Sequence, residues 1–260
     1  MDLGSRYLRW EQRGTVAYCT LDRPERRNAM TVNMYLGLRR AIRILETTGD
    51  LSALVITGSG ESFCTGGEMA GEHDDGGDEA FATYGHDVTP FEAIRNCHKP
   101  VVAMVNGMAQ GGGCILALVA DVAVVSDRAR FRIPEVLRGI ADAWYAAYLP
   151  AHIGLARARD LMLTARRFDA AEAVAMGLVA RVVPHDELEP ATRDVVADLV
   201  SAAPEARWQA KRMLNARYGN VDVMTFEATA LGPEGREGFA AFVEKRAPSW
   251  VPPDSQTGRL

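Results

Sequence analysis

Three consecutive glycines, Gly111 to Gly113, stand directly before an apolar stretch at residues 114–120. Because that stretch is apolar on every face of a helix, we expect a buried helix that begins at the glycines. The first amides of a helix have no intrahelical acceptor, and glycine offers no side chain to cap them. Such amides, helped by the helix dipole, bind an anionic oxygen well.

A second glycine-rich turn, SFCTGGEM at residues 62–69, follows a predicted strand. By itself such a turn is most simply a reversal of the chain. The two turns together could direct a pair of backbone N–H donors at one oxygen, which is the arrangement called an oxyanion hole.

Two acids are candidates for proton transfer. Glu135 lies in RIPEVL after a short strand-like stretch, where a glutamate is most often a solvated surface residue. Asp142 follows seven residues later among small and aromatic residues. An acid in such surroundings is either hydrogen-bonded or functional, and the sequence alone leaves both alternatives open.

Several other kinds of chemistry are not supported. The turn TGSGESF at residues 57–63 would need a third glycine at Phe63 to bind a dinucleotide, and no GxxxxGK[ST] or GxSxG motif occurs. The five histidines are scattered without the spacing of metal ligands, so no metal site is expected. With a net charge of −5 and no basic block, nucleic acid is not an expected partner.

The elements that position these groups indicate an α/β fold. Apolar strands are predicted within residues 51–58, 99–107 and 121–127, with a helix between the last two. A hairpin is predicted around Arg13 and Gly14, and a helix with Thr31 as its N-cap follows. From about residue 143 onwards nearly every pattern is helical, apart from one strand in LVARVVP.

The remaining composition favours a cytoplasmic protein. Four cysteines without CxxC spacing predict reduced, mostly buried thiols. We expect neither a signal peptide nor a membrane-spanning segment, because the apolar stretches are too short. Residues 71–80 are acidic and glycine-rich, which predicts a mobile loop.

Along nearly its whole length the chain resembles the crotonase (enoyl-CoA hydratase/isomerase) superfamily. The resemblance rests on the order and spacing of LDRPERRNAM, LVITGSGESFCTGGEM, HKPVVAMVNGMAQGGGCILAL and EGREGFAAFVEKR. It implies an α/β fold with a crotonase-like ββα spiral core over residues 1–195 and a C-terminal helical trimerisation region over residues 196–260. It also implies an acyl-CoA substrate, a homotrimer or hexamer (a dimer of trimers), and no cofactor beyond the CoA thioester of the substrate.

The resemblance also implies roles for individual residues. The backbone N–H groups of Thr65 and Gly112 would hold the thioester oxygen and stabilise the enolate that forms when the α-proton leaves. CoA contacts are implied at Arg26, Arg27, Ala29, Gly66 and Gly67, and, towards CoA bound to a neighbouring subunit, at Phe242 and Lys245. An acyl pocket is expected near Ile115, Trp144, Tyr145 and Tyr148, together with the loop at residues 71–89.

One departure from the family pattern bears on the reaction. Hydratases of the family carry two glutamates that activate a water, whereas this chain has Ile115 at the first position and Glu135 at the second. Isomerases that convert 3-enoyl-CoA to 2-enoyl-CoA keep only the later glutamate. The sequence therefore favours an isomerase in which Glu135 is the single base and acid.

Two classes of alternative stay open. Glu135 with Asp142 could instead hydrate an enoyl-CoA, or serve a hydrolase, a decarboxylase or a C–C lyase. A non-catalytic binder of CoA esters or of RNA is the alternative of another class, although the acidic balance argues against RNA.

Overall fold

The computed structural model describes residues 1–68 and 88–252 of the 260-residue chain. The predicted loop at residues 71–80, and most of the expected acyl-pocket loop at residues 71–89, lie outside the described residues. No described helix has both the length and the apolar character needed to cross a membrane.

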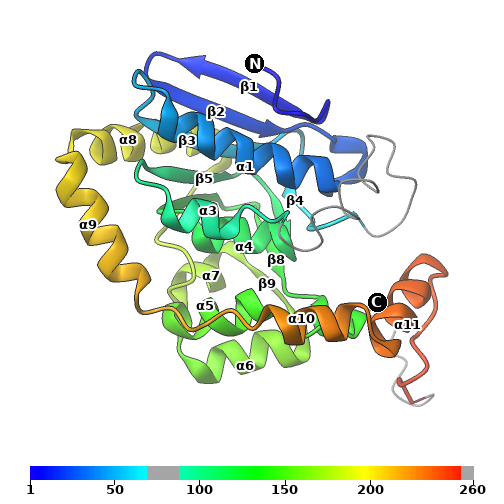
Figure 1. Cartoon of the computed structure of the whole chain (residues 1–260). Coiled ribbons are helices and arrows are strands. Elements are labelled where there is room, and N and C mark those ends of the chain that lie inside the picture. The colour runs from blue at the N-terminus through cyan, green and yellow to red at the C-terminus, as the bar shows by residue number, and fades with distance from the viewer. Residues whose placement is uncertain (69–87, 253–260) are drawn as a thin grey trace.

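The strands of the described chain form two sheets (Figure 1). The larger has the order β1 (Leu8–Arg13), β2 (Val16–Leu21), β3 (Ala53–Gly58), β5 (Val101–Val105), β7 (Val122–Ser126) and β10 (Arg181–Val183). The smaller has the order β4 (Ser62–Cys64), β6 (Met108–Gln110), β8 (Arg130–Arg132) and β9 (Arg167–Asp169). Only the β1–β2 and β8–β9 pairs are antiparallel.

The place of β3, β5 and β7 inside the larger sheet explains why these strands are almost entirely apolar. A parallel sheet is covered on both faces, so its strands are buried on both sides. On one face, Leu54 and Ile56 belong to the main core, whereas Val55 and Val102 face a second apolar cluster that contains Val195 of helix α8 (Leu188–Ser201).

Helix α1 (Val32–Thr47) follows its sequence pattern. Thr31 caps it by accepting a hydrogen bond from the Met34 amide at 3.2 Å. Its buried residues recur at helical spacing and pack on the main core: Met34, Gly37, Leu38, Ala41, Ile42 and Leu45.

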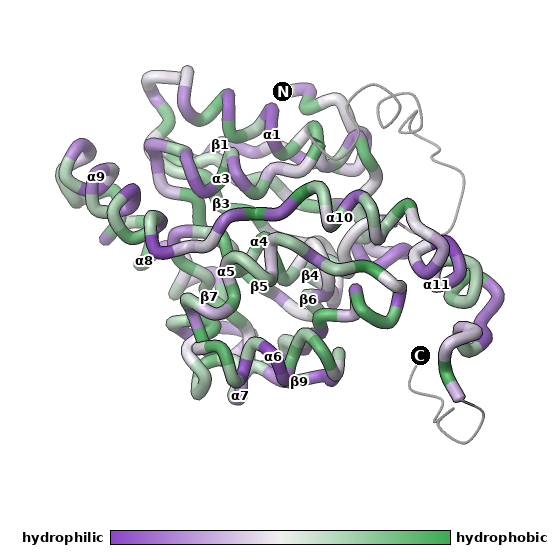
Figure 2. The backbone as a smooth tube through the Cα atoms, turned by 60° about the horizontal axis from the view of Figure 1, so that its bottom comes forward, coloured by the Kyte–Doolittle hydropathy of each residue, from purple (hydrophilic) through white to green (hydrophobic). Residues whose placement is uncertain are grey.

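Helix α4 (Gly112–Val119) lies at the centre of the molecule. Its residues from Gly113 onwards are all buried, as its apolar sequence predicts. Figure 2 shows this central helix in hydrophobic colours, whereas the outlying helix α9 (Pro204–Asn215) alternates between hydrophilic and hydrophobic.

The other helices complete the covering of the sheets. They are η1 (Pro24–Arg26), α3 (Phe91–Asn96), η2 (Glu135–Arg138), α5 (Ala143–Ile153), α6 (Leu155–Thr164), α7 (Ala170–Ala175), η3 (His185–Glu187), α10 (Val223–Ala230) and α11 (Pro233–Val243). In Figure 1, α9 and α11 extend at opposite ends of the molecule, with α10 between them.

The structure confirms the predicted α/β class, and it adds two features. The short strands of the smaller sheet include β9, which the mainly helical pattern after residue 143 does not predict. Helix α8 runs continuously through residues 195 and 196, and the predicted boundary between the core and the C-terminal region falls within this helix and stays a prediction. The four cysteines are free and buried, as predicted.

Candidate active site

The two glycine-rich turns pack against each other. Gly66 has φ +91°, and a Cβ at this position would lie 3.2 Å from the Gly112 nitrogen. Gly111 has φ +50° and ψ −132°, which side chains of L residues rarely allow. A Cβ at Gly113 would collide with the Cys64 carbonyl group. The glycines are therefore required for the close approach of the two backbones.

Helix α4 begins with free backbone donors. Gly111 is its N-cap and makes no side-chain cap. The Gly111 carbonyl accepts hydrogen bonds from the amides of Cys114 and Ile115 and from the Tyr145 hydroxyl at 2.7 Å. Within the described residues the Gly112 amide has no acceptor, so it can donate to a ligand.

The second turn is held by the segment that contains η1. The Met30 amide donates to the Gly66 carbonyl at 2.8 Å, and the Glu68 amide donates to the Met30 carbonyl at 2.8 Å. A buried ion pair joins Arg23 Nη1 to Glu68 Oε2 at 2.5 Å. Gly67 lies between Gly66 and Glu68, which make these backbone hydrogen bonds, and its own amide has no acceptor among the described residues.

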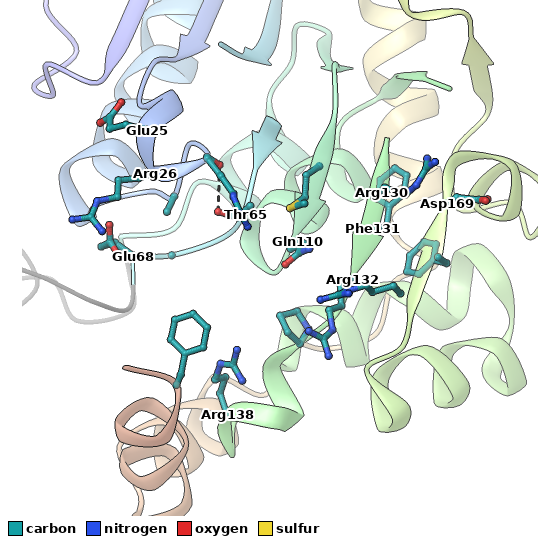
Figure 3. A pocket seen from close by; sticks show the side chains of 18 of the residues that line it. Glu25, Arg26, Thr65, Glu68, Gln110, Arg130, Phe131, Arg132, Arg138 and Asp169 are labelled. Carbon is teal, nitrogen blue, oxygen red and sulfur yellow. Dashed lines mark hydrogen bonds between the residues drawn. The ribbon is translucent and has the colours of Figure 1, made fainter. Parts of the chain in front are cut away.

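A cavity of about 910 Å³ opens beside the turns. Six of the expected oxyanion and CoA residues line it: Arg26, Arg27, Ala29, Thr65, Gly67 and Phe242. Figure 3 shows Arg26 and Glu68 at one side, Arg130 and Asp169 at the other, and Thr65 between them. The Thr65 hydroxyl donates to the Arg27 carbonyl at 3.3 Å.

Glu135 meets the first glycine turn directly. It is the first residue of η2, after β8, and a Cβ at Gly111 would lie 2.7 Å from its Oε1. The residue as a whole is partly exposed, but its Oε2 is enclosed and has no hydrogen-bond partner among the described residues. Burial raises the pKa of Glu135 well above 4.5, and the nearby Asp142 raises it further.

Asp142 has a structural contact as well as an electrostatic one. It is the N-cap of α5, accepts a hydrogen bond from the Tyr145 amide at 2.9 Å, and is 6% exposed. Burial raises its pKa to about 6. The structure therefore supports the hydrogen-bonded alternative for Asp142, and it also brings its charge near Glu135.

Two arginines also act on Glu135. Arg132 and Arg138, both buried and both on the cavity wall, lower the pKa of Glu135 and partly offset its desolvation. Burial and the neighbouring Arg132 lower the pKa of Arg138 to about 10. Its guanidinium group lies 4.1 Å from the ring centre of Phe242 on α11.

The expected acyl-pocket residues are all buried. Ile115 packs in the main core, Trp144 lies between the rings of Phe91 and Phe226, and Tyr148 donates to Glu92. Ile115 contacts the glycine turn through its backbone amide and Tyr145 through its hydroxyl, and both donate to the Gly111 carbonyl. None of these four is among the described residues that line the cavity.

The expected C-terminal contacts differ from each other. Phe242 lies on the cavity of its own chain, because α11 packs against η2. Lys245 is exposed just beyond α11 and is not among the described lining residues. A contact of either residue with CoA on a neighbouring subunit stays a prediction.

Sequence reasoning missed two polar groups at this site, Tyr35 and Arg138. A Cβ at Gly112 would lie 2.5 Å from the hydroxyl of Tyr35, and a Cβ at Gly67 would lie 3.5 Å from it. The sequence signal that could have found Tyr35 is its place next to the apolar face of α1. The second group, Arg138, is buried and lies three residues after Glu135.

Comparisons with known proteins identify the family of the chain. A family model described as enoyl-CoA hydratase/isomerase matches residues 11–253. A probable enoyl-CoA hydratase from Mycobacterium bovis is 34% identical over 249 residues, which cover 91% of this chain and 94% of the relative.

Solved structures share the whole architecture. An enoyl-CoA hydratase from Mycobacterium avium subsp. paratuberculosis has a TM-score of 0.81 at 28% identity, with 95% of this chain and 99% of that chain covered. A monofunctional enoyl-CoA isomerase from M. smegmatis has a TM-score of 0.69 at 32% identity, with 82% and 93% covered. The fold is thus the crotonase fold, with two sheets and C-terminal helices, and the chain belongs to the crotonase (enoyl-CoA hydratase/isomerase) superfamily.

Proposed function

We propose that the protein is an enoyl-CoA isomerase that moves the double bond of a 3-enoyl-CoA to the 2-position. The observation that carries this proposal is one enclosed carboxylate, Glu135, against the glycine turn, with the apolar Ile115 where a second carboxylate would be needed to activate water. A reaction that uses no water suits such a site.

The substrate's CoA would lie in the 910 Å³ cavity. Arg26 and Arg27 stand on its wall and could meet the phosphates, while Ala29 and Phe242 offer apolar contact. The thioester would then reach the glycine turns, where the backbone has no side chains to keep it away.

Two backbone amides would hold the thioester oxygen. Gly112 is one donor in this proposal. For the other, neither the Thr65 amide nor the Gly67 amide has an acceptor among the described residues, and Gly67 has the stronger support because it faces the same hydroxyl as Gly112. Negative charge appears on the oxygen only as the α-proton leaves, so these donors favour the transition state, and losing one costs about 3 kcal/mol.

Glu135 would carry the proton in two steps. Its carboxylate takes a proton from C2, the electron pair moves onto the thioester oxygen, and a dienolate forms. The protonated Glu135 then returns the proton at C4, which gives the 2-enoyl-CoA. A raised pKa suits both steps, because the carboxylate is a stronger base and its protonated form survives long enough to donate.

Hydration is the second candidate. It is favoured by the relative from M. bovis, which is named a probable enoyl-CoA hydratase, and by the proximity of Asp142 to Glu135. In that case the two carboxylates would share a water. The Asp142 side chain, however, already accepts from the Tyr145 amide, which leaves it less free to hold one.

The test is direct. Purified protein is incubated separately with a 3-enoyl-CoA and with a 2-enoyl-CoA, and the products are separated by liquid chromatography against standards of both isomers and followed by mass spectrometry. An isomerase converts the first without a change of mass, whereas a hydratase adds 18 mass units to the second. Hydration as the faster reaction would contradict the proposal, and turnover of neither substrate would favour another crotonase reaction.

A further inference from the structure

Tyr35 projects from α1 into the space above both glycine turns. Its ring meets Phe91 edge-on, with centroids 6.3 Å apart and an interplanar angle of 85°. Its hydroxyl lies 2.5 Å from where a Cβ of Gly112 would be and 3.5 Å from where a Cβ of Gly67 would be. The hydroxyl therefore lies close to both Gly112 and Gly67, whose amides are the proposed donors.

The hydroxyl has unused hydrogen-bonding capacity. The described residues include no hydrogen-bond partner for it, although the side chain is half-buried beside the core. A tyrosine hydroxyl that is only partly buried is free to donate to a ligand, and this one faces the two glycine turns. By contrast, Tyr145, the other tyrosine at this turn, is satisfied by the Gly111 carbonyl.

We propose that Tyr35 is a catalytic residue whose hydroxyl donates a third hydrogen bond to the thioester oxygen of the substrate, beside the amides of Gly112 and Gly67. Tyr35 acts in this way only if the proposed enolate chemistry is correct. The phenol keeps its proton throughout: the C2 proton goes to Glu135, the electron pair goes to the oxygen, and the hydrogen bond from Tyr35 strengthens as that oxygen becomes negative.

The surroundings keep Tyr35 a donor. Burial raises its pKa well above 10, and the neighbouring Cys64, Glu135 and Asp142 raise it further. Its hydroxyl is therefore protonated across the neutral range. Ile115 supplies no carboxylate here, and a neutral donor adds polarity without adding a negative charge to those of Glu135 and Asp142.

The test is the substitution Tyr35→Phe, which removes only an unpartnered hydroxyl and should leave the melting temperature unchanged or slightly raised. Tyr18→Phe is the matched control, since Tyr18 is also buried but lies in the second apolar cluster away from the cavity. The first readout is exchange of the C2 protons of butyryl-CoA in D₂O, followed by mass spectrometry. It measures enolate formation whatever the later outcome of the reaction.

We expect Tyr35→Phe to slow this exchange about 10- to 100-fold, through kcat rather than KM, and Tyr18→Phe to leave it unchanged. A second readout needs no turnover: hexadienoyl-CoA bound to the wild type should show a red-shifted absorbance from polarisation of its carbonyl, and Tyr35→Phe should reduce that shift.

Equal exchange rates and equal absorbance shifts in wild type and Tyr35→Phe would overturn the role of Tyr35 alone. A faster Tyr35→Phe would also overturn it, because the hydroxyl would then be an obstacle that the substrate displaces. If the wild type itself neither exchanges C2 protons nor shifts the absorbance, the proposed function fails and the role of Tyr35 fails with it.

Discussion

The carboxylate of Glu135 lies against the backbone of Gly111, so that a Cβ at position 111 would stand 2.7 Å from its Oε1. This contact joins the proposed base to the turn that opens α4. The carbonyl of the same glycine accepts a hydrogen bond from the Tyr145 hydroxyl. The placement of the carboxylate and the placement of the amide donors therefore depend on one residue.

Gly111→Ala should damage both stability and activity. The alanine must adopt φ near +50°, which costs about 1–3 kcal/mol, and its methyl group displaces the Glu135 carboxylate. Gly14→Ala is the control, since Gly14 has φ +60° but nothing within 4 Å of a Cβ. Urea unfolding and kcat/KM separate the effects: both variants lose stability, and only Gly111→Ala loses at least tenfold in activity.

Glu135→Gln should abolish proton transfer while keeping the shape of the site. A glutamine can neither accept the C2 proton nor return it, so kcat for isomerisation should fall about 100- to 10,000-fold. Binding of a saturated acyl-CoA, measured by calorimetry, should change little. Isomerase activity that survives this substitution would remove Glu135 from its assigned role.

The pH dependence of the rate reports the coupling of the two acids. Glu135 must be ionised to act as a base, so kcat/KM should rise with pH through its raised pKa. Asp142→Asn removes a negative neighbour, which lowers the pKa of Glu135 and moves the acid limb to lower pH. The asparagine oxygen can still accept from the Tyr145 amide. Complete loss of activity in this variant would instead make Asp142 a direct participant.

The same acids predict how stability changes with pH. The pKa values of Glu135 and Asp142 are higher in the folded protein than their ordinary values of 4.5 and 3.8, so the folded state binds more protons. The free energy of unfolding should therefore fall as the pH rises from about 4 to above 6. The free energies of unfolding of wild type and Asp142→Asn are measured with urea at each pH. The gap between these two free energies should become smaller at low pH, where Asp142 is protonated and uncharged. A gap that stays constant with pH would contradict the assigned pKa of Asp142.

A partly buried ion pair holds α9 to the core. Lys211 Nζ contacts Asp121 Oδ2 at 2.9 Å and donates to the Ile94 carbonyl at 2.9 Å. Lys211→Met leaves the Asp121 charge uncompensated and should destabilise the protein by about 3 kcal/mol. Adding Asp121→Asn should recover part of that loss, which thermal unfolding can measure. No recovery would mean that Lys211 acts through packing.

Much of the fold could be predicted because its signals are local. The cap at Thr31, the hairpin at Gly14 and the apolar strands follow from neighbouring residues, and the structure has each of them. Strand β9, three residues long, could not be predicted. It exists only because Phe131 of β8 pairs with Phe168, and nothing within Arg167–Asp169 specifies that partner.

The sequence by itself determined the family, the α/β class and the residues that could do chemistry. Glycine turns, a buried helix and an isolated acid can be recognised from the order of residues alone. Only the tertiary structure decided which of them meet. The contact of Glu135 with Gly111, and the approach of the Tyr35 hydroxyl to Gly67 and Gly112, join segments far apart in the chain. Burial and electrostatic coupling arise from such contacts, so the raised pKa values of Glu135 and Asp142 are properties of the folded molecule and not of the sequence pattern.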